Sequence, residues 1–235
     1  MLYYITTIKA EEILKQLKSL VDPKSVAGMA RFGINPENTY GIAIPNLRRL
    51  AKEIGQDHLL AQQLWNSGIH EAKILASMID DPKMVSEKQL EQWVKDFDSW
   101  DVCDQVCMNL FEKIPLAVKK IKDWSKREEE FVKRTAYALI ACLAWHDKEA
   151  PDQFFIKFFP IIKHGATDER NFVKKAVNWA LRNIGKRNLF LNKEAIKFAK
   201  EIQSASWRTK SAQWIAADAI RELEDEAVQR RLKKT

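Results

Sequence analysis

Apolar residues recur every three or four positions through almost the whole sequence, which is the spacing that places them on one face of an amphipathic helix. Proline opens several of these stretches, and glycine closes two of them, at Gly33 and Gly55. The sequence holds only 7 Gly and 7 Pro, which is few for a β-rich fold with many tight turns. After a first helix that includes residues 13–20, the predicted helices occupy residues 23–33, 45–55, 57–66, 70–79, 89–97, 100–113, 115–124, 128–145, 151–164, 168–187, 192–203 and 206–223. We therefore predict an all-α fold.

The later helices form pairs, and the second members of these pairs resemble one another. Six-residue segments beginning at Phe131, Phe172 and Trp207 share a pattern of an aromatic residue, bases and small residues, at offsets of 41 and 35 residues. Such offsets suit HEAT-like two-helix repeats, which stack into an α–α superhelix (a solenoid) with one helix of each pair on its concave face. Connections are short and the composition does not change along the chain. We expect a single domain over residues 1–235, with a helical cap (1–55) and stacked helix pairs (56–235).

Composition narrows the class of protein. The formal net charge is +7, which suits a polyanionic partner such as nucleic acid. No apolar run is long enough for a membrane span, and the charged N-terminal residues do not resemble a signal peptide. The three cysteines, without an export signal, favour reduced thiols in a cytoplasmic protein. The histidines and cysteines have no metal-ligand spacing, and phosphate-binding glycine loops and nucleophile elbows are absent from the sequence.

A column of bases runs through the aligned second helices. Arg134, Lys175 and Lys210 each follow the aromatic residue of their segment by three positions, and Lys73 fits the same column in the 70–79 helix. Equivalent positions of stacked repeats lie in a row, so these bases predict a basic stripe on the concave face that can contact successive phosphates. An ordinary row of solvated side chains is the alternative interpretation.

The helix beginning at Trp100 breaks this column. Cys103 stands at the basic position with Asp104 beside it, and Trp100 and Asp104 share a helix face at i, i+4 spacing. A carboxylate among bases can stabilise positive charge that develops on a sugar. Alternatively, Asp101 and Asp104 are first-turn acids that interact with the helix dipole. Trp179, Lys175 and Arg182 also lie near one face, although a tryptophan at such spacing is often a core residue.

Several segments resemble, in order, the bacterial alkylpurine DNA glycosylases built from HEAT-like repeats (the AlkD type). The resemblance covers most of the chain. The segments are Met29-Ala-Arg-Phe32, Tyr40-Gly-Ile-Ala-Ile-Pro-Asn-Leu-Arg48, Trp100-Asp-Val-Cys-Asp104, Val132-Lys-Arg134-Thr-Ala and Lys174-Lys-Ala-Val-Asn-Trp179-Ala-Leu-Arg182.

This resemblance implies a specific site. It implies that Asp104 is the catalytic carboxylate, that Trp100 and Trp179 contact the deoxyribose of the lesion, and that Arg134 holds the adjacent backbone. It further implies excision of N3- and N7-alkylated purines from double-stranded DNA without metal or organic cofactor. Phe32 departs from the tyrosine that family members commonly carry there, which puts lesion preference in doubt. The candidate DNA-binding residues are Trp100, Trp179, Arg134, Lys175, Lys174, Arg182, Lys210, Phe32, Tyr40 and Arg48.

Two other functions fit the same features. A non-catalytic HEAT-like module that binds distorted or branched DNA would use the same basic stripe. A protein–protein scaffold of the armadillo kind would have no DNA affinity at moderate salt. No long coiled-coil seam predicts assembly, so we expect a monomer.

Overall fold

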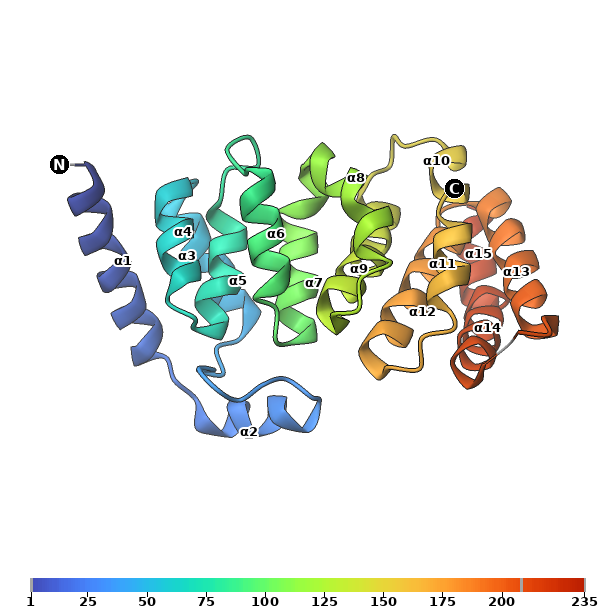
Figure 1. Ribbon diagram of the computed structural model, residues 1–235, viewed down its shortest axis with the longest axis horizontal. Helices are drawn as coiled ribbons and strands as arrows, with labels where there is room; N and C mark the ends of the chain where they lie inside the picture. Colours follow the sequence, from blue (N-terminus) through green and yellow to red (C-terminus); the bar gives the residue numbers. More distant parts are fainter. Residues whose placement is uncertain (1, 208, 235) are drawn as a thin grey trace. The chain divides into compact units, whose positions relative to one another are not determined.

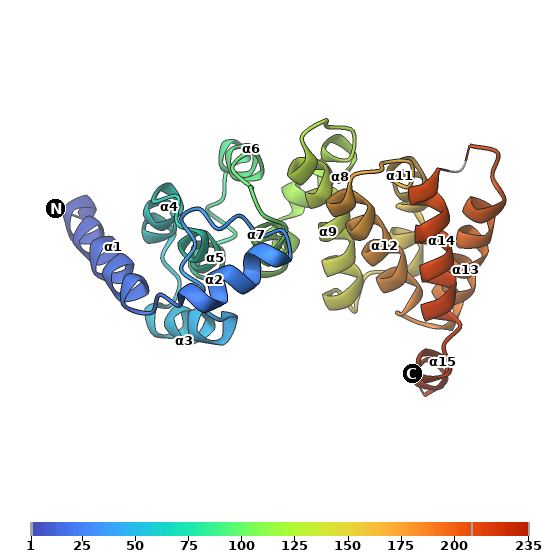
Figure 2. The ribbon, with the colours of Figure 1, turned by 90° about the horizontal axis from the view of Figure 1, so that it is seen from below.

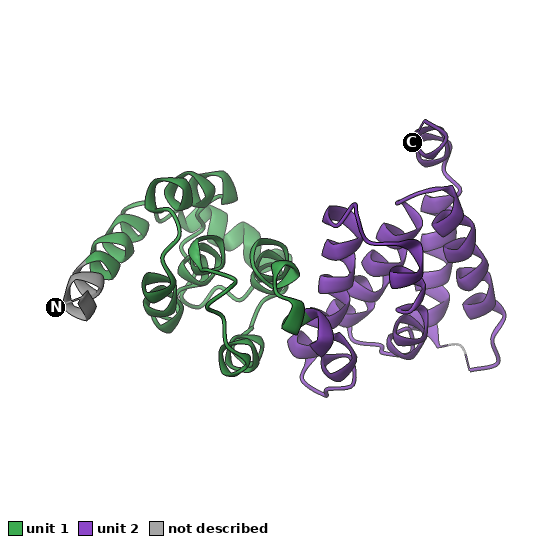
Figure 3. Ribbon diagram, turned by 90° about the horizontal axis from the view of Figure 1, so that it is seen from above, with its two compact units in different colours: residues 1–117 green, residues 118–235 purple. Residues whose placement is uncertain are grey.

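The computed structural model describes residues 2–207 and 209–234, with side chains from Lys9 onward, and the described part is helical without any strand. The chain, drawn as a ribbon in Figure 1, divides into two compact units, Met1–Ala117 and Val118–Thr235 (Figure 3). The expected single domain over residues 1–235 stays a prediction.

Unit 1 contains paired antiparallel helices that follow a longer N-terminal helix. Its elements are α1 (Leu2–Ser19), α2 (Pro23–Arg31), α3 (Ile44–Ile54), α4 (His58–Asn66), α5 (His70–Ile79), α6 (Glu87–Lys95), α7 (Trp100–Asn109) and a 3₁₀ turn (Phe111–Lys113). Helix α5 lies at the centre, where it packs against α3, α4 and α7. Every residue of α5 except Met78 is buried, which explains its nearly continuous apolar pattern.

Helix α8 (Pro115–Trp124) leads into unit 2, which repeats the paired arrangement. The remaining helices are α9 (Glu130–His146), α10 (Asp152–Ile156), α11 (Phe159–Gly165), α12 (Asn171–Gly185), α13 (Leu189–Ser204), α14 (Lys210–Leu223) and α15 (Glu226–Leu232). The second helices of successive pairs pack side by side, α9 on α12 and α12 on α14. This nearest-neighbour stacking is the arrangement that the sequence repeats predicted.

Helix boundaries follow local capping chemistry. The Asp57 and Ser86 side chains accept hydrogen bonds from the third backbone N–H that follows them, at 3.0 and 3.2 Å, and so begin α4 and α6. Gly55 ends α3 with a φ of 75°, a value that a residue without a β-carbon adopts without steric cost.

Some predicted boundaries were wrong. The single helix expected over residues 151–164 is two short helices, because Pro160 has no backbone N–H to continue the ladder and instead stands in the first turn of α11. The helix expected from residue 192 begins earlier, at Leu189, because Asn188 caps α13 by accepting a hydrogen bond from the Leu191 N–H at 2.8 Å. Asn192 is buried and donates to the Gly185 carbonyl at 3.0 Å.

The end of the chain also differs from expectation. Thr209 caps α14 by accepting from the Ala212 N–H at 3.1 Å, so Trp207 precedes this helix rather than lying inside it. An additional helix, α15, follows Leu223 and packs against α14. None of the helices in the described ranges is long and apolar enough to cross a bilayer.

Candidate functional site

The first turns of α7 present Trp100 and Asp104 on the same face. Both side chains are partly exposed, while Val102 and Cys103 between them are buried in the core. The Trp100 indole Nε1–H donates to the Phe32 carbonyl at 3.0 Å, which fixes the orientation of the ring at the helix start. Cys103 therefore belongs to the core, and Asp104 is the residue of this pair that reaches solvent.

Residues from distant parts of unit 1 hold the start of α7 in place. Ser99 is fully buried, and its hydroxyl accepts a hydrogen bond from the Asn35 N–H at 2.9 Å instead of capping its own helix. The His70 Nε2–H donates to Asp101 at 2.9 Å. Burial alone would lower the pKa of His70, but the hydrogen bond and charge of Asp101 outweigh burial and raise it. Asp101 thus connects the start of α7 to the start of α5.

Glu71 organises the segment that precedes α3. Its buried carboxylate accepts hydrogen bonds from the backbone N–H groups of Tyr40, Gly41 and Ile42, at 2.9, 2.6 and 3.1 Å. The His70 N–H also donates to the Asn38 carbonyl at 2.9 Å. As seen from below in Figure 2, α2 and the residues after it cross the ends of α5 and α7 where these helices begin. Tyr40 and Phe32 are thereby placed at the same end of unit 1 as Trp100.

Sequence reasoning missed the parts played by His70 and Glu71. The available signal was the position of His70 and Glu71 at the start of a largely apolar helix. A carboxylate that such a helix buries needs hydrogen-bond donors from elsewhere in the chain. Of the other unit 1 candidates, Phe32 is 75% exposed, and Arg48 is exposed on α3. The structure brings Phe32 and Trp100 together, and it places Arg48 on a different element.

Two bases of the predicted stripe are buried. Arg134 is 5% exposed, and its guanidinium donates to the Phe172 carbonyl at 2.5 Å. Lys73 is 8% exposed, and its ammonium donates to the Asp96 carbonyl at 3.0 Å. Long basic side chains can bury their stems in this way while they satisfy carbonyl groups at the ends of neighbouring helices. The repeat column thus placed Lys73 and Arg134 in a predicted surface stripe, whereas the structure buries both side chains.

The observed helix starts also change the alignment of the column. Asp104 is the fifth residue of α7, as Arg134 is of α9 and Lys175 is of α12. Trp214, not Lys210, has this place in α14. Asp104 itself, rather than its neighbour Cys103, therefore stands where α9 and α12 carry a base.

The remaining bases of unit 2 have different surroundings. Lys175 and Lys210 are exposed, whereas the Lys174 ammonium lies 5.2 Å from the centre of the Trp214 ring. Arg182 forms a close ion pair with Glu222. The predicted contact of Arg182 with DNA would therefore have to compete with this carboxylate.

Trp179 lines an open groove of about 760 Å³ in unit 2, at the ends of α9 and α12 and beside α15. Its lining residues are Ala144, Trp145, Lys148, Trp179, Asn183, Lys186, Arg187, Asn188 and Arg231. Trp179 is therefore accessible rather than fully buried in the core. Trp100 and Asp104 lie in unit 1 while Arg134 and Trp179 lie in unit 2, so their convergence stays a prediction.

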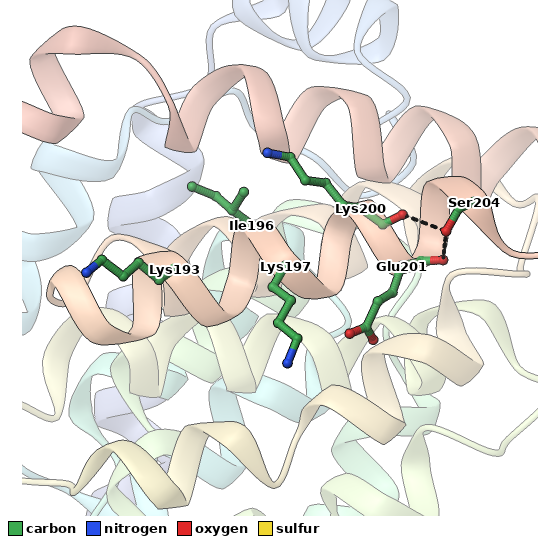
Figure 4. A pocket seen from close by; sticks show the side chains of 6 residues that line it. All are labelled: Lys193, Ile196, Lys197, Lys200, Glu201 and Ser204. Atoms are coloured by element: carbon green, nitrogen blue, oxygen red, sulfur yellow. Dashed lines mark hydrogen bonds between the residues drawn. The ribbon is translucent and has the colours of Figure 1, made fainter.

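A second hollow lies on α13 and is lined by Lys193, Lys197 and Lys200 with neighbouring side chains (Figure 4). The lysine side chains point in different directions from the helix rather than toward one point. Lys200 is paired with Glu224 at 2.9 Å. We therefore assign no site to this surface.

Comparisons with known structures define the fold. The chain matches a solved structure from a new family of proteins related to the HEAT-like repeat DNA glycosylases with affinity for branched DNA structures. The identity is 18%, the match covers 90% of this chain and 94% of that one, and the TM-score is 0.74. This similarity confirms the HEAT-like fold predicted from the repeats.

Two designed proteins resemble the chain more weakly. One is an engineered protein with 14% identity over 76% of this chain and 81% of its own, and a TM-score of 0.38. The other is a designed armadillo repeat protein in complex with the peptide (KR)4, with 15% identity over 80% and 88% of the two chains and a TM-score of 0.36. Similarities at this level inform neither fold nor function.

A search among curated proteins finds no significant match. A family model described as DNA alkylation repair enzyme, in contrast, matches residues 13–223, which is most of the chain. It includes the helices that carry Trp100, Asp104, Arg134 and Trp179. The chain therefore belongs to the DNA alkylation repair enzyme family.

Proposed function

We propose that this protein is a DNA glycosylase that hydrolyses the N-glycosidic bond of cationic N3- and N7-alkylpurines in double-stranded DNA, as a monomer and without a cofactor. The observation that carries the proposal is the pairing of Trp100 and Asp104 on one face of α7, with the indole fixed by the Phe32 carbonyl. Membership of the DNA alkylation repair enzyme family supports the same substrate class.

The chemistry requires little from the protein at the departing base. An alkylated purine already carries positive charge, so it leaves as a neutral base with the electron pair of the bond to C1′. The barrier lies in the positive charge that develops on the sugar. Asp104 would stabilise this charge and orient the water that attacks C1′, accepting the proton that the water loses. The Trp100 indole would add a cation–π attraction that grows as the sugar becomes positive.

The decisive experiment is single-turnover release of 7-methylguanine from a methylated duplex. We expect release by the wild type and a loss of at least about 100-fold in rate for Asp104→Asn, with duplex affinity retained. Asp123→Asn, an exposed acid on α8, is the matched control and should react like the wild type. Equal rates for the wild type and Asp104→Asn would show that the catalytic assignment is wrong.

A second candidate function is a non-catalytic module that binds distorted or branched DNA. The observation that favours it is the match to a protein family described as having affinity for branched DNA structures. Under this hypothesis the wild type binds DNA in a salt-sensitive manner but releases no base from any alkylated duplex. The same assay therefore separates the two functions.

A further inference from the structure

The groove around Trp145 and Trp179 has features that the repeat pattern does not explain, and of its lining residues only Trp179 has a predicted contact with the lesion. Trp145 stands at the end of α9 and is 53% exposed, which is unusual for so large an apolar side chain. Trp179 reaches the groove from α12 and Arg231 reaches it from α15. Three helices of one unit thus supply aromatic and basic side chains to one hollow of about 760 Å³.

The charge of the groove is positive. Lys148, Lys186, Arg187 and Arg231 line it, and its lining includes no carboxylate. Lys186 is paired with Glu222 at 2.7 Å, but that single carboxylate also serves Arg182. Four cations and no carboxylate therefore line the groove itself, which favours an anionic ligand.

Arg187 supplies a fixed charge at the base of the groove. Its guanidinium donates to the Ala144 carbonyl at 2.9 Å and lies 4.0 Å from the centre of the Phe155 ring. Burial lowers the pKa of Arg187, although an arginine remains protonated at neutral pH. Its hydrogen bonds go to the Ala144 and Ala150 carbonyl groups, while Asp147 and Asp152, whose negative charges act on it, are not among the residues that line the groove.

The aromatic surface lies next to this charge. The Trp145 ring is stacked on His146 with 5.1 Å between centroids and 22° between planes, which restricts its orientation. The Lys148 ammonium donates to the Trp145 carbonyl, and both residues line the groove. An oriented indole in a groove lined by cations suits a nucleotide, whose base stacks on the ring while its phosphate contacts a cation.

We propose that this groove binds an unpaired nucleotide of a DNA strand, with its base on Trp145 and its phosphate among Lys148, Lys186 and Arg231. This proposal rests on one part of the proposed function, that the protein binds DNA, and it does not require base excision. Unpaired nucleotides occur at strand ends and branch points, so the groove would give preference for such DNA over a fully paired duplex.

The test compares two labelled DNAs by fluorescence anisotropy, a fully paired duplex and the same duplex with a short single-stranded overhang. The wild type should bind the overhang DNA more tightly. Trp145→Ala should lower the affinity for overhang DNA by about 10-fold, the usual range for loss of one base–aromatic stack, and leave paired-duplex affinity unchanged. Trp145→Phe should retain most of the preference. Phe190→Ala, at an aromatic residue of the same unit that is 47% exposed outside the groove, is the matched control and should have no effect.

Three outcomes would overturn the inference. In two of them, Trp145→Ala leaves the overhang affinity unchanged, or it reduces the affinity for both DNAs equally, as a general loss of structure would. Displacement of the overhang DNA by low concentrations of free thymidine monophosphate would identify a mononucleotide ligand and equally reject a DNA strand. Release of 7-methylguanine by the same variants keeps the two proposals separate. If the wild type releases no base but prefers overhang DNA in a manner that depends on Trp145, only the glycosylase proposal is refuted.

Discussion

Removal of the Glu71 carboxylate should detach the segment before α3 from unit 1. In Glu71→Ala, three backbone N–H groups lose their acceptor, those of Tyr40, Gly41 and Ile42. Gly41 and Ile42 are buried, whereas Tyr40 is partly exposed and can be rehydrated. An unsatisfied buried donor costs about 1–3 kcal/mol, and the variant regains part of the cost of burying a carboxylate. We therefore expect a net loss of about 3 kcal/mol in the free energy of unfolding of unit 1.

Hydrogen exchange and urea unfolding would measure this effect. The amides of residues 40–42 should exchange at least about 100-fold faster in the variant, the factor that corresponds to about 3 kcal/mol. Glu11→Ala, at an exposed position on α1, is the control and should change stability by less than about 0.5 kcal/mol. A loss below about 1 kcal/mol for Glu71→Ala, or unchanged exchange at residues 40–42, would refute the reasoning.

Two further predictions concern unit 2 and the glycines. A β-carbon at Gly165 would clash with the hydroxyl oxygen of the buried Tyr137. Gly165→Ala should therefore destabilise the protein by about 1–3 kcal/mol, as measured by thermal unfolding. Gly28 on α2 has open space around it, so Gly28→Ala should be neutral or slightly stabilising. Burial alone would raise the pKa of Asp168, but hydrogen bonds from Arg170 and Lys133 have the larger effect and lower the pKa to about 2. The ionised Asp168 should therefore contribute about 1–2 kcal/mol to the free energy of unfolding, a figure that allows for solvent screening. This contribution should be complete above pH 3.8 and should be lost as the pH falls toward 2. Asp168→Asn should remove this pH dependence from urea unfolding.

Most helices could be predicted because their determinants are local. Helices α4 to α6 combine an apolar face with a capping side chain or an adjacent turn, and both are visible in a short window of sequence. The prediction was wrong where local signals competed. Phenylalanines from 154 to 159 continue an apolar pattern across the break before Pro160. Asn192 also has a capping side chain, but packing buries it four residues after the cap that the structure uses, Asn188.

The surroundings of the candidate site were less predictable because they depend on contacts distant in the sequence. The spacing of Trp100 and Asp104 predicted a shared helix face, and the structure agrees. The burial of Lys73 and Arg134 depends on carbonyl groups 23 and 38 residues away, at the ends of other helices. Glu71 likewise binds N–H groups about 30 residues earlier. The charged start of α5 indicates that a carboxylate needs donors there, but it does not indicate which N–H groups supply them.

The segment between α2 and α3 has a consequence for how this repeat array can change during evolution. Repeat proteins commonly gain or lose whole helix pairs, since each pair contacts only its neighbours. Here one short segment is bound at once to Glu71 at the start of α5 and to Ser99 at the start of α7. A pair duplicated between these helices would separate the two anchors and leave buried polar groups without partners. The number of repeats in unit 1 is therefore fixed by this bridge, and duplication or deletion should be tolerated only outside it.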